Sequence, residues 1–92
     1  MTSTEKLLGA LRTDLGFMTT AYDDRLIAYL KNAQIEITRQ GATLKDDDAG
    51  DDELTIMYAA WMWRRRDEMT GMPRMLRYAL NNRIMQEKMN NG

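Results

Sequence analysis

The sequence lacks cysteine and histidine altogether. Without cysteine there is no disulfide framework, no thiol nucleophile and no thiolate metal site. Without histidine the chain loses the commonest general base and the commonest metal ligand of proteins. No pair of carboxylates stands at a spacing that suggests catalysis. We therefore expect neither an enzyme nor a cofactor or metal site, and a protein of the cytoplasm or of an assembly built there.

Long hydrophobic runs are missing as well. The longest uncharged run, residues 54–63, has ten positions, whereas a helix that spans a bilayer needs about 20. The first five residues do not follow the basic-to-apolar order of a signal peptide. One proline and six glycines among 92 residues leave room for long helices, and no segment alternates like a strand. We expect a single all-α domain over residues 1–92, with no membrane contact.

The spacing of apolar residues predicts about four helices. Leu7, Leu11 and Leu15 share one face of the first helix. Gly9 inside it costs about 1 kcal/mol relative to alanine, which indicates either the close approach of another helix or a frayed first segment. The predicted helices cover residues 4–15, 21–39, 52–69 and 73–89, and residues 90–92 are expected to fray.

The start of the second helix carries a capping signal. Thr20 is followed three residues later by Asp23, the order of a capping box in which the two residues satisfy free backbone N–H groups. Gly41 after Arg39 supplies the expected stop. Thr20 and Asp23 are therefore expected to cap a helix that begins near Ala21.

Residues 42–52 are rich in aspartate and have no apolar period, which predicts an exposed acidic loop. Several carboxylates on a flexible loop suggest calcium. An EF-hand with Gly50 at its sixth position, however, requires an acid where Lys45 stands. A solvated loop, whose last acids stabilise the start of the next helix, is the better interpretation. The aspartates are Asp46, Asp47, Asp48, Asp51 and Asp52.

Charge is distributed unevenly along the chain. Residues 1–40 carry five basic and five acidic side chains, residues 41–53 one and six, and residues 54–92 seven and three. The net charges of these segments are 0, −5 and +4. An acidic middle and a basic last third favour head-to-tail contacts between copies, or a charged partner.

The run 54–63 predicts a helix that is apolar on every side. Three or four short neighbouring helices can hardly cover such a helix, so we expect part of its surface to be free for contact with another subunit. Trp61 and Trp63 lie about 200° apart on a helix. We expect one in the core and one at an interface, against the alternative that both are buried within the monomer.

Three arginines close the run, and they suggest contacts with nucleic-acid phosphates. Consecutive helical residues fan over about 200°, however, so they do not share one surface. We expect one of them to pair with an acidic group and the others to meet solvent or partners. A small helical DNA-binding or DNA-packaging regulatory protein is the alternative function. Its basic patch comprises Arg64, Arg65, Arg66, Arg74, Arg77 and Arg83.

Nine methionines are many for this length, and they concentrate in the last two predicted helices. Methionine adapts to irregular gaps and to surfaces that meet more than one neighbour. Core filling accounts for most of them, while Met85 and Met89 are candidates for contact with a neighbour.

Three stretches, taken in order, resemble the small head-tail connector (adaptor) proteins of long-tailed bacteriophages. Residues 19–30 join a threonine-rich cap, an aspartate pair and an amphipathic helix, which continues through Ala33 and Ile35 to Gly41. Residues 53–67 form an apolar helix that ends in aromatic and arginine residues. Residues 73–76 precede the last helix. The resemblance covers residues 4–88.

This resemblance implies a structural protein of the virion, assembled in the host cytoplasm. Such proteins form homo-oligomeric rings, usually dodecameric, that dock beneath the portal protein and extend the DNA channel. They present a surface to the next neck or tail-completion protein, and DNA passes without sequence-specific binding. In related adaptors the C-terminal part engages the portal, which corresponds here to residues 77–92. The expected subunit or portal contacts are Trp61, Trp63, Arg64, Arg65, Arg66, Arg74, Arg77, Met85 and Met89.

Overall fold

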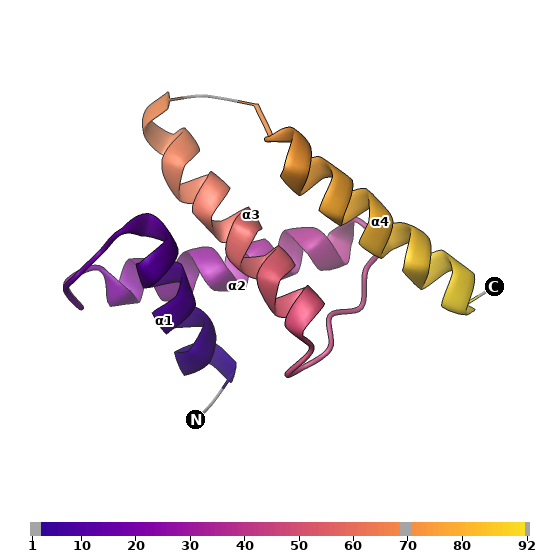
Figure 1. Ribbon diagram of the computed structural model, residues 1–92, viewed down its shortest axis with the longest axis horizontal. Coiled ribbons are helices and arrows are strands. Elements are labelled where there is room, and N and C mark those ends of the chain that lie inside the picture. Colours follow the sequence, from indigo (N-terminus) through magenta and orange to yellow (C-terminus); the bar gives the residue numbers. More distant parts are fainter. Residues whose placement is uncertain (1–2, 69–70, 92) are drawn as a thin grey trace.

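Each of the predicted helical segments forms a helix in the computed structural model, which describes residues 3–68 and 71–91 (Figure 1). The described residues contain no strand, so the all-α prediction is confirmed. The predicted boundaries differ from the observed ones by three residues at most. The helices are α1 (Ser3–Leu15), α2 (Asp23–Arg39), α3 (Ala49–Glu68) and α4 (Arg74–Asn91).

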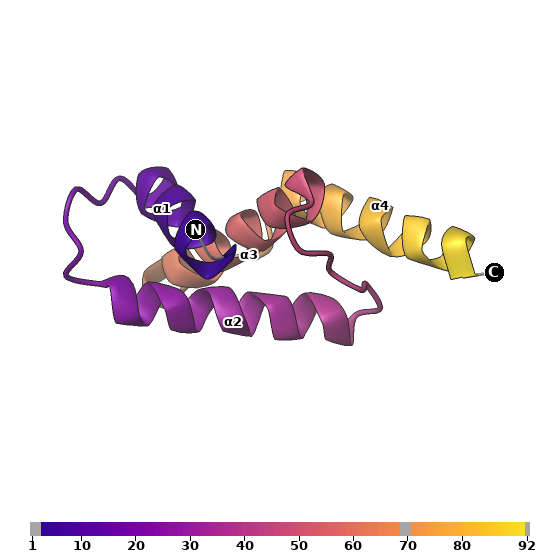
Figure 2. The same cartoon turned by 90° about the horizontal axis from the view of Figure 1, so that it is seen from below.

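The helices form a thin slab with dimensions of 44 × 33 × 17 Å. Figure 2 shows α2 in one layer and α1, α3 and α4 in the other. Helix α3 packs against all three other helices. Helix α4 runs back alongside α3, and its C-terminal end lies at the far end of the molecule from α1 (Figure 1). This placement leaves α4 with more free surface than its neighbours.

Leucine, isoleucine and alanine from all four helices make the core. Helix α1 buries Leu7 and Leu11 of its apolar stripe and half-buries Leu15, and α2 buries the residues at i, i+4, i+7 and i+11 that its sequence spacing predicts. Burying a leucine or isoleucine side chain stabilises the fold by roughly 1.5–3 kcal/mol relative to leaving it in water. The core residues that are at most 3% exposed are Leu7, Leu11, Leu26, Leu30, Ala33, Ile37, Ala42, Leu54, Ala59, Ala60, Leu76 and Leu80.

The capping box predicted at Thr20 is wrong. Helix α2 begins at Asp23, and its N-cap, Tyr22, makes no side-chain capping bond. The Asp23 carboxylate instead accepts two hydrogen bonds from Arg12 of α1, of 2.9 and 3.1 Å. Thr20 contributes only its carbonyl, which accepts from the Asp23 N–H at 3.1 Å. Arg12, on another helix, therefore binds the Asp23 carboxylate that the local spacing had assigned to the cap.

The stop predicted at Gly41 is confirmed. Gly41 has φ +119°, a left-handed conformation that favours glycine. Its N–H donates to the carbonyl of Thr38 at 3.0 Å, and the N–H of Ala42 donates to that of Ile37 at 3.4 Å. These two bonds form a Schellman motif, which turns the chain toward the α2–α3 loop.

The predicted acidic loop 42–52 ends earlier than expected, because Asp48 starts α3. Its Oδ1 accepts from the N–H of Asp51 at 2.9 Å, and its carbonyl accepts from the N–H of Asp52 at 2.8 Å. Asp51 and Asp52 therefore belong to the first turn of α3, and Asp51 is only 4% exposed. The prediction of an exposed loop is correct for Asp46, Asp47 and Asp48.

The expectation that run 54–63 keeps surplus surface is wrong. Seven of its ten positions are buried, and the other three are half-buried. The neighbours suffice because α1, α2 and α4 each cover a different part of α3, and because Ala59 and Ala60 are small enough to let them approach. Thr55, also buried, donates from Oγ1 to the carbonyl of Asp51 at 2.9 Å.

The two ends of the chain also differ from expectation. Helix α4 continues through Asn90 and Asn91, two residues beyond the predicted end; the fraying expected there stays a prediction, and Gly92 lies outside the described residues. Helix α1 is regular through Gly9. A Cβ at Gly9 would meet no atom within 4 Å, so neither close approach of another helix nor fraying explains this glycine.

Candidate functional site

Most of the large apolar side chains left exposed belong to α4. Among the described residues seven are exposed, and four of these lie on this helix. Met75 and Met89 are 74% and 75% exposed, and Tyr78 and Met85 are 57% and 59% exposed. Leu76 and Leu80, on the opposite side of the helix, are buried. Residues 75, 78, 82, 85 and 89 together are called the outer face of α4 below.

Exposed basic side chains also lie on α4, and two of them, Arg74 and Lys88, lie directly beside this outer face. Arg74, Arg77 and Lys88 are exposed, and none of them forms an ion pair with another residue in the described ranges. Apolar surface with a charged rim is the usual anatomy of a protein interface. Of the residues predicted for contacts, the structure thus brings Arg74, Arg77, Met85 and Met89 together on one helix.

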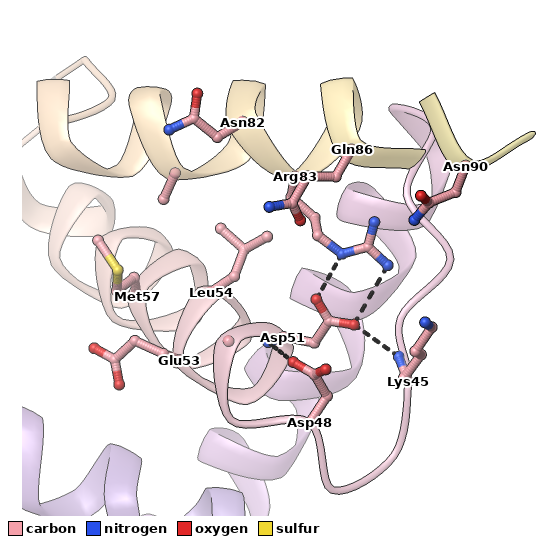
Figure 3. Close-up of a pocket in the computed structure, with 12 residues that line it drawn as sticks. Lys45, Asp48, Asp51, Glu53, Leu54, Met57, Asn82, Arg83, Gln86 and Asn90 are labelled. Atoms are coloured by element: carbon pink, nitrogen blue, oxygen red, sulfur yellow. Dashed lines mark hydrogen bonds and ion pairs between the residues drawn. The ribbon is translucent and has the colours of Figure 1, made fainter. Parts of the chain in front are cut away.

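An ion pair between α3 and α4 orients this face outward (Figure 3). Arg83 Nε donates to Asp51 Oδ1 at 2.7 Å, and Arg83 Nη2 lies 3.4 Å from Asp51 Oδ2. Asp51 also accepts from the backbone N–H of Lys45 at 2.9 Å. The side chains of Asp51 and Arg83 are 5% and 13% exposed, respectively. Burial acts to raise the pKa of Asp51, but Arg83 and the Lys45 N–H outweigh it and hold that pKa below its ordinary value.

The same arginine connects α4 to the α2–α3 loop. Arg83 Nη2 donates to the carbonyl of Thr43 at 2.6 Å. Glu87, one turn along α4, accepts from the backbone N–H of Thr43. Hydrogen bonding from the Thr43 side chain, together with that from the Thr43 N–H, lowers the pKa of Glu87 below its ordinary value. Two side chains on the inner side of α4 thus hold the loop, so the helix has little freedom to rotate.

This network was not anticipated from the sequence, which placed Arg83 in a phosphate-binding patch. That assignment is wrong, because the Arg83 guanidinium is occupied by Asp51 and Thr43. The only local signal is the i, i+4 spacing of Arg83 and Glu87, which is common on exposed helices. The partner Asp51 lies 32 residues away in the sequence.

A polar groove of about 310 Å³ lies between the start of α3 and the C-terminal half of α4 (Figure 3). Its lining includes Asp48, Asp51 and Glu53 as well as Arg83 and Asn82. Asp48 caps α3 and Asp51 binds Arg83. Within the described part of the chain no three acidic side chains converge as they would around a metal ion.

The two tryptophans occupy different environments. Trp63 is 8% exposed and packs edge to face against Phe17, Tyr22 and Tyr29, with ring centroids 5.3–5.9 Å apart. Trp61 is half-buried, and its Nε1 donates to the carbonyl of Gly71 at 3.2 Å. Trp63 is therefore the core tryptophan and keeps little surface for a neighbour, whereas a contact role for Trp61 stays a prediction.

Arg64 and Arg65, which follow Trp63, diverge as expected. Arg64 Nη2 donates to the carbonyl of Asp14 at 3.2 Å and lies 3.4 Å from its carboxylate, so one of them does pair with an acidic residue. The Arg65 guanidinium lies 4.8 Å from the ring centroid of Trp61, a cation–π distance. The side chain of Arg66 lies outside the described part. Arg64 and Arg65 thus contact different partners.

No protein-family model, curated protein or solved structure matches this chain. In the described residues, no helix has the length and apolarity that crossing a membrane requires. The resemblance to head-tail connectors therefore stays a prediction, and the outer face of α4 is the feature from which a function must be argued.

Proposed function

We propose that the protein is a structural subunit of a bacteriophage head-tail connector ring. The observation that carries the proposal is the outer face of α4. A chain of this size that leaves four large apolar side chains exposed on one helix has surface suited to another protein. The basic rim of Arg74, Arg77 and Lys88 suits a partner with acidic groups. The resemblance of residues 4–88 to connector proteins names the kind of assembly.

Charge polarity supports contacts between unlike surfaces of neighbouring copies. Asp46, Asp47 and Asp48 are exposed on the α2–α3 loop, whereas the exposed charges on α4 are mostly basic. Contacts between unlike surfaces generate a closed ring when the rotation between copies permits it. In this proposal α3 is the central apolar helix that holds each subunit together, and the ring, dodecameric in related proteins, is completed by its neighbours.

The proposed role is mechanical. The ring docks beneath the portal at the capsid vertex, extends the DNA channel and offers its other side to a neck or tail-completion protein. DNA passes through without being read in sequence, and no reaction or cofactor is involved. The place of action is the head-tail interface of a virion assembled in the host cytoplasm.

Two variants test the proposal. Met85→Glu combined with Met89→Glu puts two negative charges on the outer face, and Met18→Glu puts one on a 97% exposed methionine outside α4. Electron microscopy of portal-containing capsids mixed with each protein reports decoration of the portal vertex. We expect the wild type and Met18→Glu to decorate it and the double variant to lose most of this binding. A wild-type protein that stays a strict monomer and never decorates the vertex overturns the proposal.

The exposed arginines favour a second candidate, a DNA-binding or packaging regulatory protein. Arg74 and Arg77 are the residues of the predicted patch that stay on one exposed helix. Phosphate binding would weaken steeply with salt, and Arg74→Gln with Arg77→Gln would reduce that salt dependence. A duplex-DNA titration at low salt decides: no measurable affinity removes this candidate, while tight, salt-sensitive binding favours it over the ring.

A further inference from the structure

The outer face of α4 has the spacing of a coiled-coil seam. Met75, Asn82 and Met89 recur at seven-residue intervals, and Tyr78 and Met85 recur at the same interval three residues later. These are the a and d positions of a heptad repeat. All five side chains are exposed, and the ion pair of Arg83 points the opposite side of the helix into the fold. The seam therefore belongs to the exterior of the molecule.

Asn82 is the one strongly polar residue of this seam. A single asparagine at an a position costs stability, but it fixes the register and the number of helices in a coiled coil. Its side-chain amide both donates and accepts, so it matches a copy of itself across a two-fold axis. Against an apolar helix of another protein the same amide would be buried without a partner. Asn82 therefore favours a second copy of this chain.

The residues beside the seam allow this pairing in the parallel sense. One flank carries Arg74, Asn81 and Lys88, and the other carries Ala79 and Gln86. In a parallel pair each flank lies next to the opposite flank of the partner helix. The basic side chains then face neutral ones, and no like charges are forced together.

We infer that two copies of the protein pair through α4, parallel and in register, with Asn82 facing its own counterpart. The pair buries the outer face in the free protein. The seam contributes five side chains per copy, fewer than the roughly 20–30 residues per side of a standard interface, so the dimer is weak and forms at high protein concentration. This inference does not rest on the connector role, because it concerns the protein without a portal.

Single cysteines test the pairing, because the natural chain has none. A disulfide needs Cα atoms about 4.4–6.8 Å apart, a separation that facing core positions reach and outward positions do not. Under mild oxidation we expect Asn82→Cys to form a covalent dimer about tenfold faster than Arg77→Cys, because pairing raises the local thiol concentration. Arg77 is exposed on α4 but lies off the seam, so equal rates overturn the inference.

The direction of pairing is tested by mixing Met75→Cys with Met89→Cys. A parallel pair yields disulfides between identical variants, and a predominance of the mixed disulfide contradicts the parallel register. A measurement without cysteine uses Asn82→Leu, which replaces the polar residue of the seam by an apolar one. We expect its dimer dissociation constant to fall about tenfold, or about 1.4 kcal/mol, in sedimentation equilibrium, with unchanged helicity by circular dichroism. An unchanged dissociation constant places Asn82 outside the interface and overturns the inference.

Discussion

At the scale of single residues, the pair Asp51–Arg83 decides which side of α4 faces solvent. Arg83 and Met85 lie about 200° apart around the helix. Binding of Arg83 to Asp51 at 2.7 Å therefore turns Met85 outward. The same guanidinium holds the Thr43 carbonyl, so one side chain joins α3, α4 and the α2–α3 loop. A change at this residue should affect both the stability of the fold and the presentation of the outer face.

We expect Arg83→Met to destabilise the protein by about 2–4 kcal/mol, since removing one partner leaves a buried charge without compensation. Methionine keeps most of the apolar stem, so the loss is electrostatic. Arg39→Met is the matched control, because Arg39 pairs with Glu36 at the surface with 70% of its side chain exposed, and such pairs contribute less than about 1 kcal/mol. Urea unfolding measures both. Equal effects for the two variants would show that the Asp51–Arg83 pair is no stronger than a surface pair.

The lowered pKa of Asp51 also predicts how stability depends on pH. The unfolded chain takes up a proton at Asp51 near the ordinary value of about 3.9, before the folded protein does. Stability from this group is therefore complete above that value and is lost as the pH falls through the lower pKa of the folded state. Asp51→Asn removes the titrating group. Urea midpoints measured from about pH 6 to pH 3 should fall more steeply for the wild type, and parallel curves contradict the assignment.

The pairing of individual charged side chains was the part of the structure least predictable from the sequence. Asp51 was expected to be a loop acid that stabilises the start of a helix, and Arg83 to extend a candidate phosphate-binding patch, yet the two form a largely buried pair across 32 positions. No local spacing encodes such a pairing, because it depends on how α4 returns along α3. For Arg64 the kind of partner was predicted. Three consecutive helical arginines point in different directions, so one of them was expected to pair with an acidic residue, but the sequence did not identify Asp14 as that residue.

At the scale of elements, the spacing of apolar residues predicted that the helices form. It did not predict where α2 and α3 begin. Leu26, Leu30, Ala33 and Ile37 are buried as their period predicts. The start of α2 was misjudged because Arg12, on another helix, binds Asp23. The start of α3 was placed too late because Asp48 was counted as one of several similar loop acids. The end of α2 was predicted correctly at Gly41, because it depends on local hydrogen bonds and on a left-handed backbone conformation that favours glycine.

The observed caps predict unlike effects for two substitutions. Asp48→Ala removes the carboxylate that accepts from the N–H of Asp51, and we expect a loss of about 1 kcal/mol in the free energy of unfolding. Thr20→Ala should change it by less than about 0.5 kcal/mol, because the exposed Thr20 side chain makes no hydrogen bond to the start of α2 among the described residues. Thermal and urea unfolding distinguish the two. A larger effect of the substitution at Thr20 than of the one at Asp48 would support the capping box predicted at Thr20.

At the scale of the whole molecule, the apolar surface left for neighbours lies on α4 and not on the run 54–63. The run 54–63 drew attention because it is apolar on every side, yet α1, α2 and α4 cover it. On α4, Met85 and Met89 were named as contact candidates but Met75 was counted with the core, since composition does not show which side of a helix packs inward. That choice depends on Arg83 and Glu87, whose partners come from the α3 start and the loop. The sequence therefore predicted a surplus of apolar surface and placed only part of it, at Met85 and Met89, on the helix that carries it.

This arrangement predicts the size of the protein in solution. The Cα radius of gyration is 13.2 Å, somewhat above the roughly 12 Å of an average globule of this length, because the molecule is flat and α4 extends along its edge. We expect small-angle scattering of the variant Met85→Glu with Met89→Glu to give a radius close to that of the single chain at every concentration, because charge on the outer face prevents association. The wild type and Met18→Glu should match it when dilute and increase with concentration. If the double variant increases as much as the wild type, the associating surface lies elsewhere than on α4.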